Sequence, residues 1–138
     1  MFSLVYVSAA VTWFNPGELR GLLAGARAHN ARAGITGMLL YKDGNFMQAL
    51  EGDEGAVLSL RDRIAGDRRH RGLVTLCSGA TEARQFSDWT MGFADLGAPD
   101  GQWPEGYSGF LDLPLTAPAF EPAPQRCRDL LQVFRQMA

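Results

Sequence analysis

The sequence has few of the residues that build metal centres and disulfide frameworks. Its 138 residues include only two cysteines and two histidines. Cys77 and Cys127 lie far apart, and neither belongs to a CxxC pair. A structural zinc site needs about four such ligands held together, so none is expected. We predict two reduced thiols, as in a cytoplasmic protein.

Charge and hydropathy do not favour two common kinds of partner. The net charge is −2 at pH 7, so there is no overall attraction to nucleic acid or to an acidic membrane surface. No apolar run approaches the length of a membrane span, and the first residues lack the basic region of a signal peptide. We expect a cytoplasmic protein that binds neither nucleic acid nor membrane.

Several catalytic motifs are missing. The sequence has no Ser-His-Asp arrangement with a glycine elbow, no phosphate-binding loop of the Walker type and no HExxH. A Gly-x-x-Gly stretch at 34–37 lies between a predicted helix and a predicted strand, whereas a dinucleotide fingerprint follows a strand. Function must therefore be sought in other groups.

The most informative stretch is the apolar hairpin at 34–52. An Asp-Gly dipeptide at 43–44 suits a tight turn between two strands. A two-residue turn sets Leu39 opposite Gln48, and Gln48 is the polar exception at the centre of the second strand. A buried amide must find partners or cost a few kcal/mol. On the same face, Gly37 is expected to leave room for something to lie against the sheet.

The rest of the first 96 residues predicts alternating strands and helices. Asn15, Pro16 and Glu18 form a helix start, and Asp53 caps a second helix. The predicted order is βαββαββ, a ferredoxin-like α+β sandwich with a mixed five-stranded sheet and two helices on one face. The remaining elements are strands at 3–9, 73–78 and 86–93, and helices from 16 to about 31 or 32 and at 54–65.

The composition changes after about residue 96. Six of the seven prolines lie between Pro99 and Pro124, which is typical of irregular chain. We therefore divide the chain into a domain at 1–96 and an extension at 97–138. The extension contains a predicted amphipathic helix at 124–137, with a helical turn near 105–112. It is predicted to cover the sheet face opposite the helices, with self-association of the helix as the alternative.

Neutral hydrogen-bonding side chains at buried positions suggest a binding pocket. Each has a structural explanation as well: a core tyrosine, a helix-terminal asparagine or a strand glutamine. Together they indicate a pocket between the sheet and the helices, with a basic mouth, suited to a flat and mostly neutral heteroaromatic ligand with an anionic tail. The polar groups are Tyr6, Asn30 and Gln48, and the walls are Leu22 and Ile64.

Six segments together resemble the BLUF domain, the flavin-binding blue-light sensor of bacteria. The resemblance extends from about residue 2 to 95, and residue types and spacing agree throughout. The segments are Ser3-Leu-Val-Tyr-Val-Ser8, His29-Asn30, Gly34-Ile-Thr-Gly-Met-Leu-Leu-Tyr41, Gly44-Asn-Phe-Met-Gln-Ala-Leu-Glu-Gly52, Asp67-Arg-Arg-His70 and Phe86-Ser-Asp-Trp-Thr-Met-Gly-Phe93.

The resemblance implies a role for each pocket residue. Tyr6 is similar to the photoactive tyrosine that gives an electron and a proton to the excited flavin. Gln48 is similar to the switch glutamine between that tyrosine and flavin N5 and O4. Asn30 matches the residue that holds the O4 and N3 edge of the flavin.

Further positions are implied around this centre. Leu22 and Ile64 stand where the family places branched aliphatics on either side of the isoalloxazine ring. Asp67 and Arg69 match positions near the ribityl and phosphate end, and His29 matches a position at the pocket margin. Trp89 and Met91 match the fifth-strand pair tied to signal output.

The implied function is a blue-light photoreceptor in the bacterial cytoplasm, without catalytic turnover. Its cofactor is expected to be FAD, with FMN or riboflavin as alternatives. Output is expected through an unidentified downstream protein, and self-association as a homo-oligomer is expected. Two other readings stay open: an acylphosphatase-like hydrolase that uses Arg69 and Asn30 on the same scaffold, and a ligand-free oligomerising regulatory domain.

Overall fold

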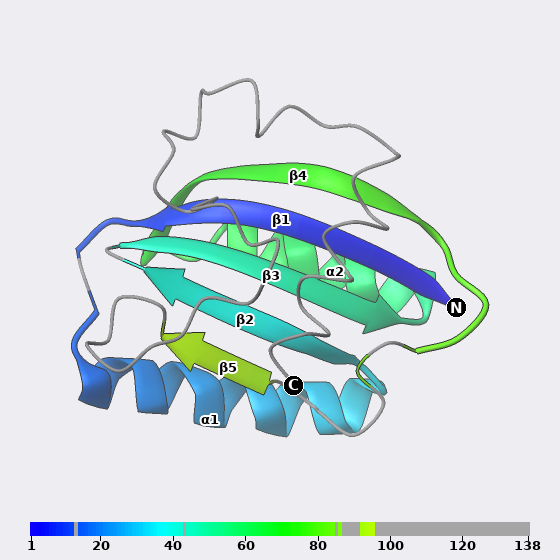
Figure 1. Cartoon of the computed structure of the whole chain (residues 1–138), viewed down its shortest axis with the longest axis horizontal. Helices are drawn as coiled ribbons and strands as arrows, with labels where there is room; N and C mark the ends of the chain where they lie inside the picture. The colour runs from blue at the N-terminus through cyan, green and yellow to red at the C-terminus, as the bar shows by residue number, and fades with distance from the viewer. Residues whose placement is uncertain (13, 43, 85, 87–91, 96–138) are drawn as a thin grey trace.

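The structure is a computed structural model that describes residues 1–12, 14–42, 44–84, 86 and 92–95. Its elements follow the order βαββαββ, with two helices on one face of a sheet (Figure 1). The strands are β1 (Phe2–Ala10), β2 (Thr36–Lys42), β3 (Asn45–Gly52), β4 (His70–Ala80) and β5 (Gly92–Asp95), and the helices are α1 (Pro16–Ala33) and α2 (Glu54–Ala65).

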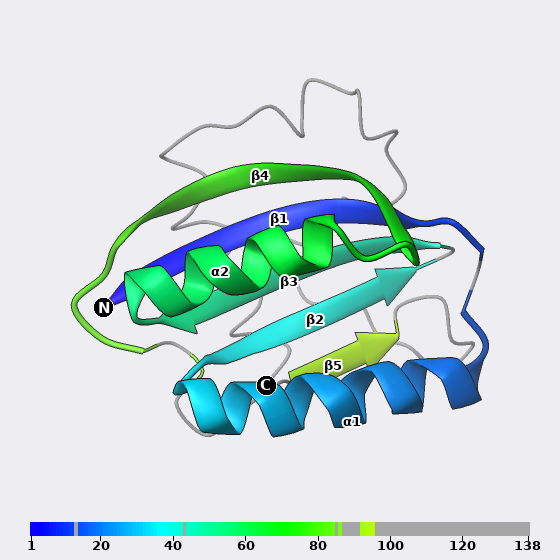
Figure 2. The same ribbon diagram turned by 180° about the vertical axis from the view of Figure 1, so that it is seen from behind.

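The sheet has the order β4-β1-β3-β2-β5, so β1 and β3 lie at its centre. The first four strands in this order pair antiparallel, and β5 runs parallel to β2. Seen from behind, α1 and α2 both lie on the same side of this sheet (Figure 2). The predicted α+β class, the antiparallel strands β1 to β4 and the two helices are confirmed.

The helix ends follow from local hydrogen bonds. The Asn15 side chain accepts from the backbone N–H of Glu18 at 2.8 Å, and the Glu18 carboxylate accepts from the backbone N–H of Asn15 at 3.1 Å. This reciprocal pair satisfies two donors that the first turn leaves open. Gly34 ends α1 in the left-handed conformation, with φ of 69°, and Asp53 caps α2. The predicted helix starts are confirmed, and α1 continues to Ala33, slightly past its expected end.

The hairpin register is the predicted one, with Leu39 opposite Gln48 and Gly37 opposite Leu50. The expectation about Gly37 is wrong, however. A Cβ at this position would collide with the backbone carbonyl of Ala49, so the glycine permits close approach of the two strands and does not open space for a ligand.

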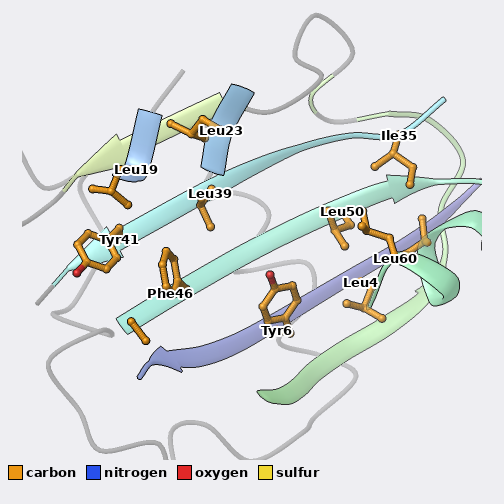
Figure 3. Packing of buried hydrophobic residues seen from close by; sticks show 12 residues of the cluster. Leu4, Tyr6, Leu19, Leu23, Ile35, Leu39, Tyr41, Phe46, Leu50 and Leu60 are labelled. Carbon is orange, nitrogen blue, oxygen red and sulfur yellow. The ribbon is translucent and has the colours of Figure 1, made fainter. Parts of the chain in front are cut away.

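The apolar core lies between the sheet and the helices (Figure 3). Leu4, Phe46 and Leu50 from the sheet and Val57 from α2 are fully buried within it. The opposite sheet face is also buried, since Val5, Val7, Leu40 and Met47 are at most 1% exposed. Both faces of the sheet are therefore covered.

Three expectations about strands and cysteines need correction. β4 starts at His70 rather than at 73, because a bulge-like register shift and the positive φ of Gly72 let the strand continue into the basic stretch. Phe86 is not part of β5 (Gly92–Asp95), and its backbone N–H bonds to the Glu51 side chain, whereas residues 87–91 of the expected strand lie outside the described residues. Cys77 is disulfide-bonded, so the prediction of a reduced thiol there is wrong.

Other expectations fall on residues that the structure does not describe. The extension at 97–138 with its predicted helices, Trp89 and Met91 all lie outside the described residues. Within the described part of the chain, no helix is long and apolar enough to cross a membrane.

Candidate functional site

A cavity of about 250 Å³ lies between the helices and the sheet. All of the predicted site residues that the structure describes line it, although they come from four separate elements and one loop. Ligand pockets usually measure roughly 300–1,000 Å³, so this space suits a single flat ring system whose tail continues outward. The predicted residues on its wall are Tyr6, Leu22, His29, Asn30, Gln48, Ile64, Asp67 and Arg69.

Tyr6 and Gln48 form the polar centre of the cavity. They are directly opposite each other on β1 and β3, and both are nearly inaccessible to solvent, with 1% and 5% exposure. The Tyr6 hydroxyl donates a hydrogen bond to Gln48 Oε1. The Gln48 Nε2 group is therefore the end of the amide turned away from the phenol.

Burial keeps the Tyr6 phenol protonated. Removal from water raises the pKa of Tyr6 far above its ordinary value, and the negative charge of Asp67 raises it further. A lone phenolate is therefore strongly disfavoured in this position. Tyr6 acts as a hydrogen-bond donor in the resting state, and loss of its proton needs a coupled change such as loss of an electron.

The two helices supply the apolar walls and a second amide. Leu22 and Asn30 line the cavity from α1, and Ile64 lines it from α2. Asn30 is 1% exposed, and its backbone carbonyl accepts from the N–H groups of Gly34 and Ile35 at the helix end. The helix terminus thus fixes the backbone that carries the Asn30 amide at the wall of the cavity.

An ion pair marks the opening of the cavity. The Arg69 guanidinium bonds to both carboxylate oxygens of Asp67, at 2.7 Å from Nη2 and 3.0 Å from Nε. These hydrogen bonds lower the pKa of Asp67 to about 2, and the Asp67 carboxylate raises the pKa of Arg69. Arg69 is 54% exposed, so its cation faces solvent while Asp67 fixes its direction.

Seven lining residues were not among the predicted site residues: three apolar ones, Ala26, Leu39 and Leu60, and the four that follow. His70 bonds to Ser8 Oγ at 3.1 Å through Nδ1 and packs 4.9 Å from the Phe46 ring, and burial lowers its pKa. Arg63 contacts His29 Nδ1 at 3.3 Å. The last two, Gly21 and Gly25, lie one turn apart on α1.

Different signals could have identified some of these residues. His70 ends the Asp67-Arg-Arg-His70 segment that resembles the family. Starting the fourth strand at this residue would have placed His70 at the cavity. Arg63 lies in the last turn of α2, where an exposed basic residue is ordinary, so the sequence gives no signal for it. Glycine inside a helix costs about 0.5–1 kcal/mol of stability relative to alanine. Two glycines next to Leu22, at positions 21 and 25, therefore indicate that the helix needs free space on this side.

These groups fit a flavin. A cavity with two amides, a phenol, branched aliphatic walls and a cationic opening offers hydrogen bonds to the edge of a flat heteroaromatic ring and a positive charge for an anionic tail. A Cβ at Gly21 or at Gly25 would meet nothing within 4 Å, so α1 presents bare backbone to this space. Fold and site together define an α+β domain with a cavity suited to an aromatic ring system beside a Tyr–Gln pair.

The chain belongs to the BLUF family, described as sensors of blue light using FAD, whose sequence profile matches residues 1–92. The predicted family resemblance is confirmed. The domain is therefore a blue-light sensor that uses a flavin.

The relatives contain this domain in different settings. Photoactivated adenylate cyclase subunit beta of Euglena longa is 34% identical over 90 residues, which cover 64% of this chain and 10% of the relative. Subunit alpha of Euglena gracilis is 36% identical over 86 residues, or 62% of this chain and 8% of that protein. The chain thus spans about a tenth of the length of these relatives.

Solved structures include proteins of similar size. The dark-state structure of BlrB, a BLUF protein, has a TM-score of 0.75 at 27% identity and covers 99% of this chain and 96% of its own. The ground state of BlsA has the same TM-score and identity and covers 99% of this chain and 88% of its own. A Klebsiella pneumoniae BlrP1 complex is 36% identical with a TM-score of 0.65, over 72% of this chain and 26% of its own.

Proposed function

We propose that this chain is a photoreceptor in which blue light rearranges the hydrogen bond between Tyr6 and Gln48, with FAD as the cofactor and FMN or riboflavin as alternatives. The observation that carries the proposal is the buried bond from the Tyr6 hydroxyl to Gln48 Oε1 at the wall of the cavity. The site residues and the family agree on the kind of ligand.

The cavity residues divide into three binding roles. Leu22 and Ile64 hold the ring from the two helices, and the Asn30 amide bonds to its polar edge. Arg69, oriented by Asp67, offers a cation to the phosphate end, with His29 at the margin. When bound, the flavin supplies absorption of blue light and an excited state that accepts one electron.

Tyr6 is the electron and proton donor of this site. A phenol that loses an electron becomes a strong acid, so its proton moves easily along an existing hydrogen bond. The acceptor of that bond is Gln48 Oε1. Return of the electron and the proton restores Tyr6, which makes the reaction reversible.

Gln48 is the switching group because the two ends of its amide differ. Oε1 accepts hydrogen bonds and Nε2 donates them. A half-turn of the amide, or transfer of a proton from Nε2 to Oε1, exchanges these ends without moving a net charge. The group facing the cavity then changes its hydrogen-bonding character, which shifts the absorption of the bound chromophore to the red.

The signal leaves the domain by a change in protein–protein contacts and without catalytic turnover. We assign Trp89 and Met91, which lie outside the described residues, to the relay. The extension at 97–138 is assigned to the face opposite the helices, and the buried side chains of Val5 and Met47 on that face support this assignment. We place the protein in the bacterial cytoplasm as a homo-oligomer that binds an unidentified downstream protein.

The hydrolase alternative is weaker than this proposal. It needs a phosphate-binding site around Arg69, yet the basic stretch at 67–71 does not follow a phosphate-cradling glycine loop. A ligand-free domain is also disfavoured, because the polar residues converge on a cavity that would gain stability from filling.

The test is the colour of the purified protein and its response to light. We expect flavin absorption in the blue, a small and reversible red shift under blue light, and recovery in the dark. Addition of FAD, FMN and riboflavin in parallel identifies the preferred cofactor. A colourless protein that takes up none of the three would refute the proposal.

A further inference from the structure

A buried hydrogen-bond cluster surrounds Glu51, outside the cavity. Glu51 is only 1% exposed, and its position on β3 turns it to the sheet face opposite Gln48. Its Oε1 accepts from Thr36 Oγ1 at 3.0 Å and from the backbone N–H of Phe86 at 2.6 Å. A carboxylate in such a position is retained only when donors satisfy it, and here one donor comes from the chain before β5.

Arg84 joins the same cluster from the same segment. Its Nη1 donates to Thr36 Oγ1 at 2.8 Å and to the backbone carbonyl of Glu51 at 3.2 Å, while Nη2 donates to the backbone carbonyl of Gly34 at 2.6 Å. One guanidinium thus reaches the end of α1, the start of β2 and the end of β3. Arginine suits this position because its planar guanidinium holds several N–H donors in a fixed geometry.

Two of these elements carry the amides of the cavity. Gly34 directly caps the last turn of α1, where its N–H bonds to the Asn30 carbonyl. Glu51 lies three residues after Gln48 on the same strand. Arg84 is therefore bonded to the backbone near both amides, and Phe86 is bonded to the Glu51 side chain. β5 begins six residues after Phe86 and pairs with β2.

We propose that Glu51, Thr36 and Arg84 form a latch that positions β5 relative to the cavity and transmits changes at Gln48 to it. This inference rests on the proposed function, because it needs Gln48 to change with light. Charge-assisted hydrogen bonds in a buried site are strong, so the latch stays closed in both states. A shift of β3 then moves Arg84 and Phe86 with it, because their hydrogen bonds to β3 stay intact.

The experiment measures amide hydrogen exchange of the flavin-bound protein in the dark and under blue light. Arg84→Gln should keep the flavin spectrum and the red shift, because Arg84 does not line the cavity. Exchange at Gly92–Asp95 should rise about tenfold in the dark, and its light-dark difference should fall by at least about half. Arg84→Lys should restore part of the protection, because its ammonium still donates.

Two controls separate positioning from general stability. Glu82→Gln changes an exposed charge beside the segment and should leave β5 exchange unchanged. Exchange in α2 should stay the same in every variant. Should Arg84→Gln fail to fold, Thr36→Val removes the bridging hydroxyl at similar volume and gives the same comparison.

The proposal is overturned if β5 exchange and its light-dark difference stay as in the wild type, or if exchange rises equally in α2. If the wild type binds no flavin or shows no red shift, the proposed function fails instead. The dark comparison between wild type and Arg84→Gln still decides in that case whether the latch positions β5.

Discussion

Tyr6 and Gln48 stand side by side on the two central strands, and the hydroxyl of one donates to the amide oxygen of the other. The bond joins two residues that are 42 positions apart in the sequence. Both side chains are shielded from water, so their mutual contact affects folding as well as the proposed photochemistry. These two effects can be measured separately.

A double-mutant cycle should detect coupling between the two residues in the free energy of unfolding. Tyr6→Phe leaves Gln48 Oε1 without this donor and should cost about 1–3 kcal/mol. Gln48→Leu should cost a similar amount, because the phenol loses its acceptor. The double variant should cost less than the sum, with a coupling of about 1 kcal/mol or more in denaturant titrations. Strict additivity would contradict the observed bond.

Illumination experiments should distinguish the role of the Gln48 amide from that of the residues that only bind the flavin. Gln48→Leu should still bind flavin, because the ring keeps its walls and Asn30, but blue light should no longer produce the red-shifted state. Tyr6→Phe should behave likewise, since its ring cannot give a proton. Absorption spectra before and after illumination check both. A normal red shift in either variant would show that the residue has been misassigned.

Gly25→Ala should stabilise the flavin-free protein and weaken flavin binding. Alanine favours a helix interior by about 0.5–1 kcal/mol over glycine, and the added Cβ meets nothing in the structure. If the ligand occupies that space, overpacking of about 1–3 kcal/mol lowers affinity roughly ten- to hundredfold.

Thermal unfolding and flavin titration measure these two effects. Ala24→Gly, an exposed position on the same helix, should destabilise the protein without a change in flavin affinity. Unchanged affinity in Gly25→Ala would place the ligand elsewhere.

Stability should fall as the pH is lowered from about 7 to 5, through His70. Burial lowers the pKa of this imidazole in the folded state, so the unfolded chain binds the proton more readily below the ordinary value of 6.5. The stabilising effect of the neutral ring is complete above that pH and is lost as the pH falls through the folded pKa.

His70→Gln keeps a polar partner for Ser8 and should flatten this part of the pH profile of unfolding. Asp67 does not interfere, because a pKa of about 2 confines its contribution to a loss below about pH 4. A slope that His70→Gln leaves unchanged would assign the pH dependence to other groups.

Local chemistry predicted most of the fold. Asn15 and Glu18 form the capping box that their spacing indicates, and the Asp-Gly turn sets Leu39 opposite Gln48. Such features depend on neighbours in sequence or on one hairpin. The position of Phe86 outside β5 could not be predicted in this way, because its backbone N–H is bonded to the side chain of Glu51, 35 residues earlier.

Site residues were predicted where polarity conflicts with burial. Gln48 and Asn30 are amides in otherwise apolar patterns, and both lie on the cavity. His70 and Arg63 carry no such conflict, since charged or polar residues are ordinary at helix and strand ends. Gly37 shows the opposite error: its missing side chain was interpreted as space, although a strand carbonyl fills it.

The place of β1 between β3 and β4 has a consequence for durability. Both edges of this strand are paired, so the backbone that carries Tyr6 is among the parts of the molecule least able to open. In the proposed light cycle, the side chains of Tyr6 and Gln48 change while β1 stays paired along both edges. We expect such a sensor to withstand many light cycles, because β1 has no unpaired edge from which misfolding or aggregation could start.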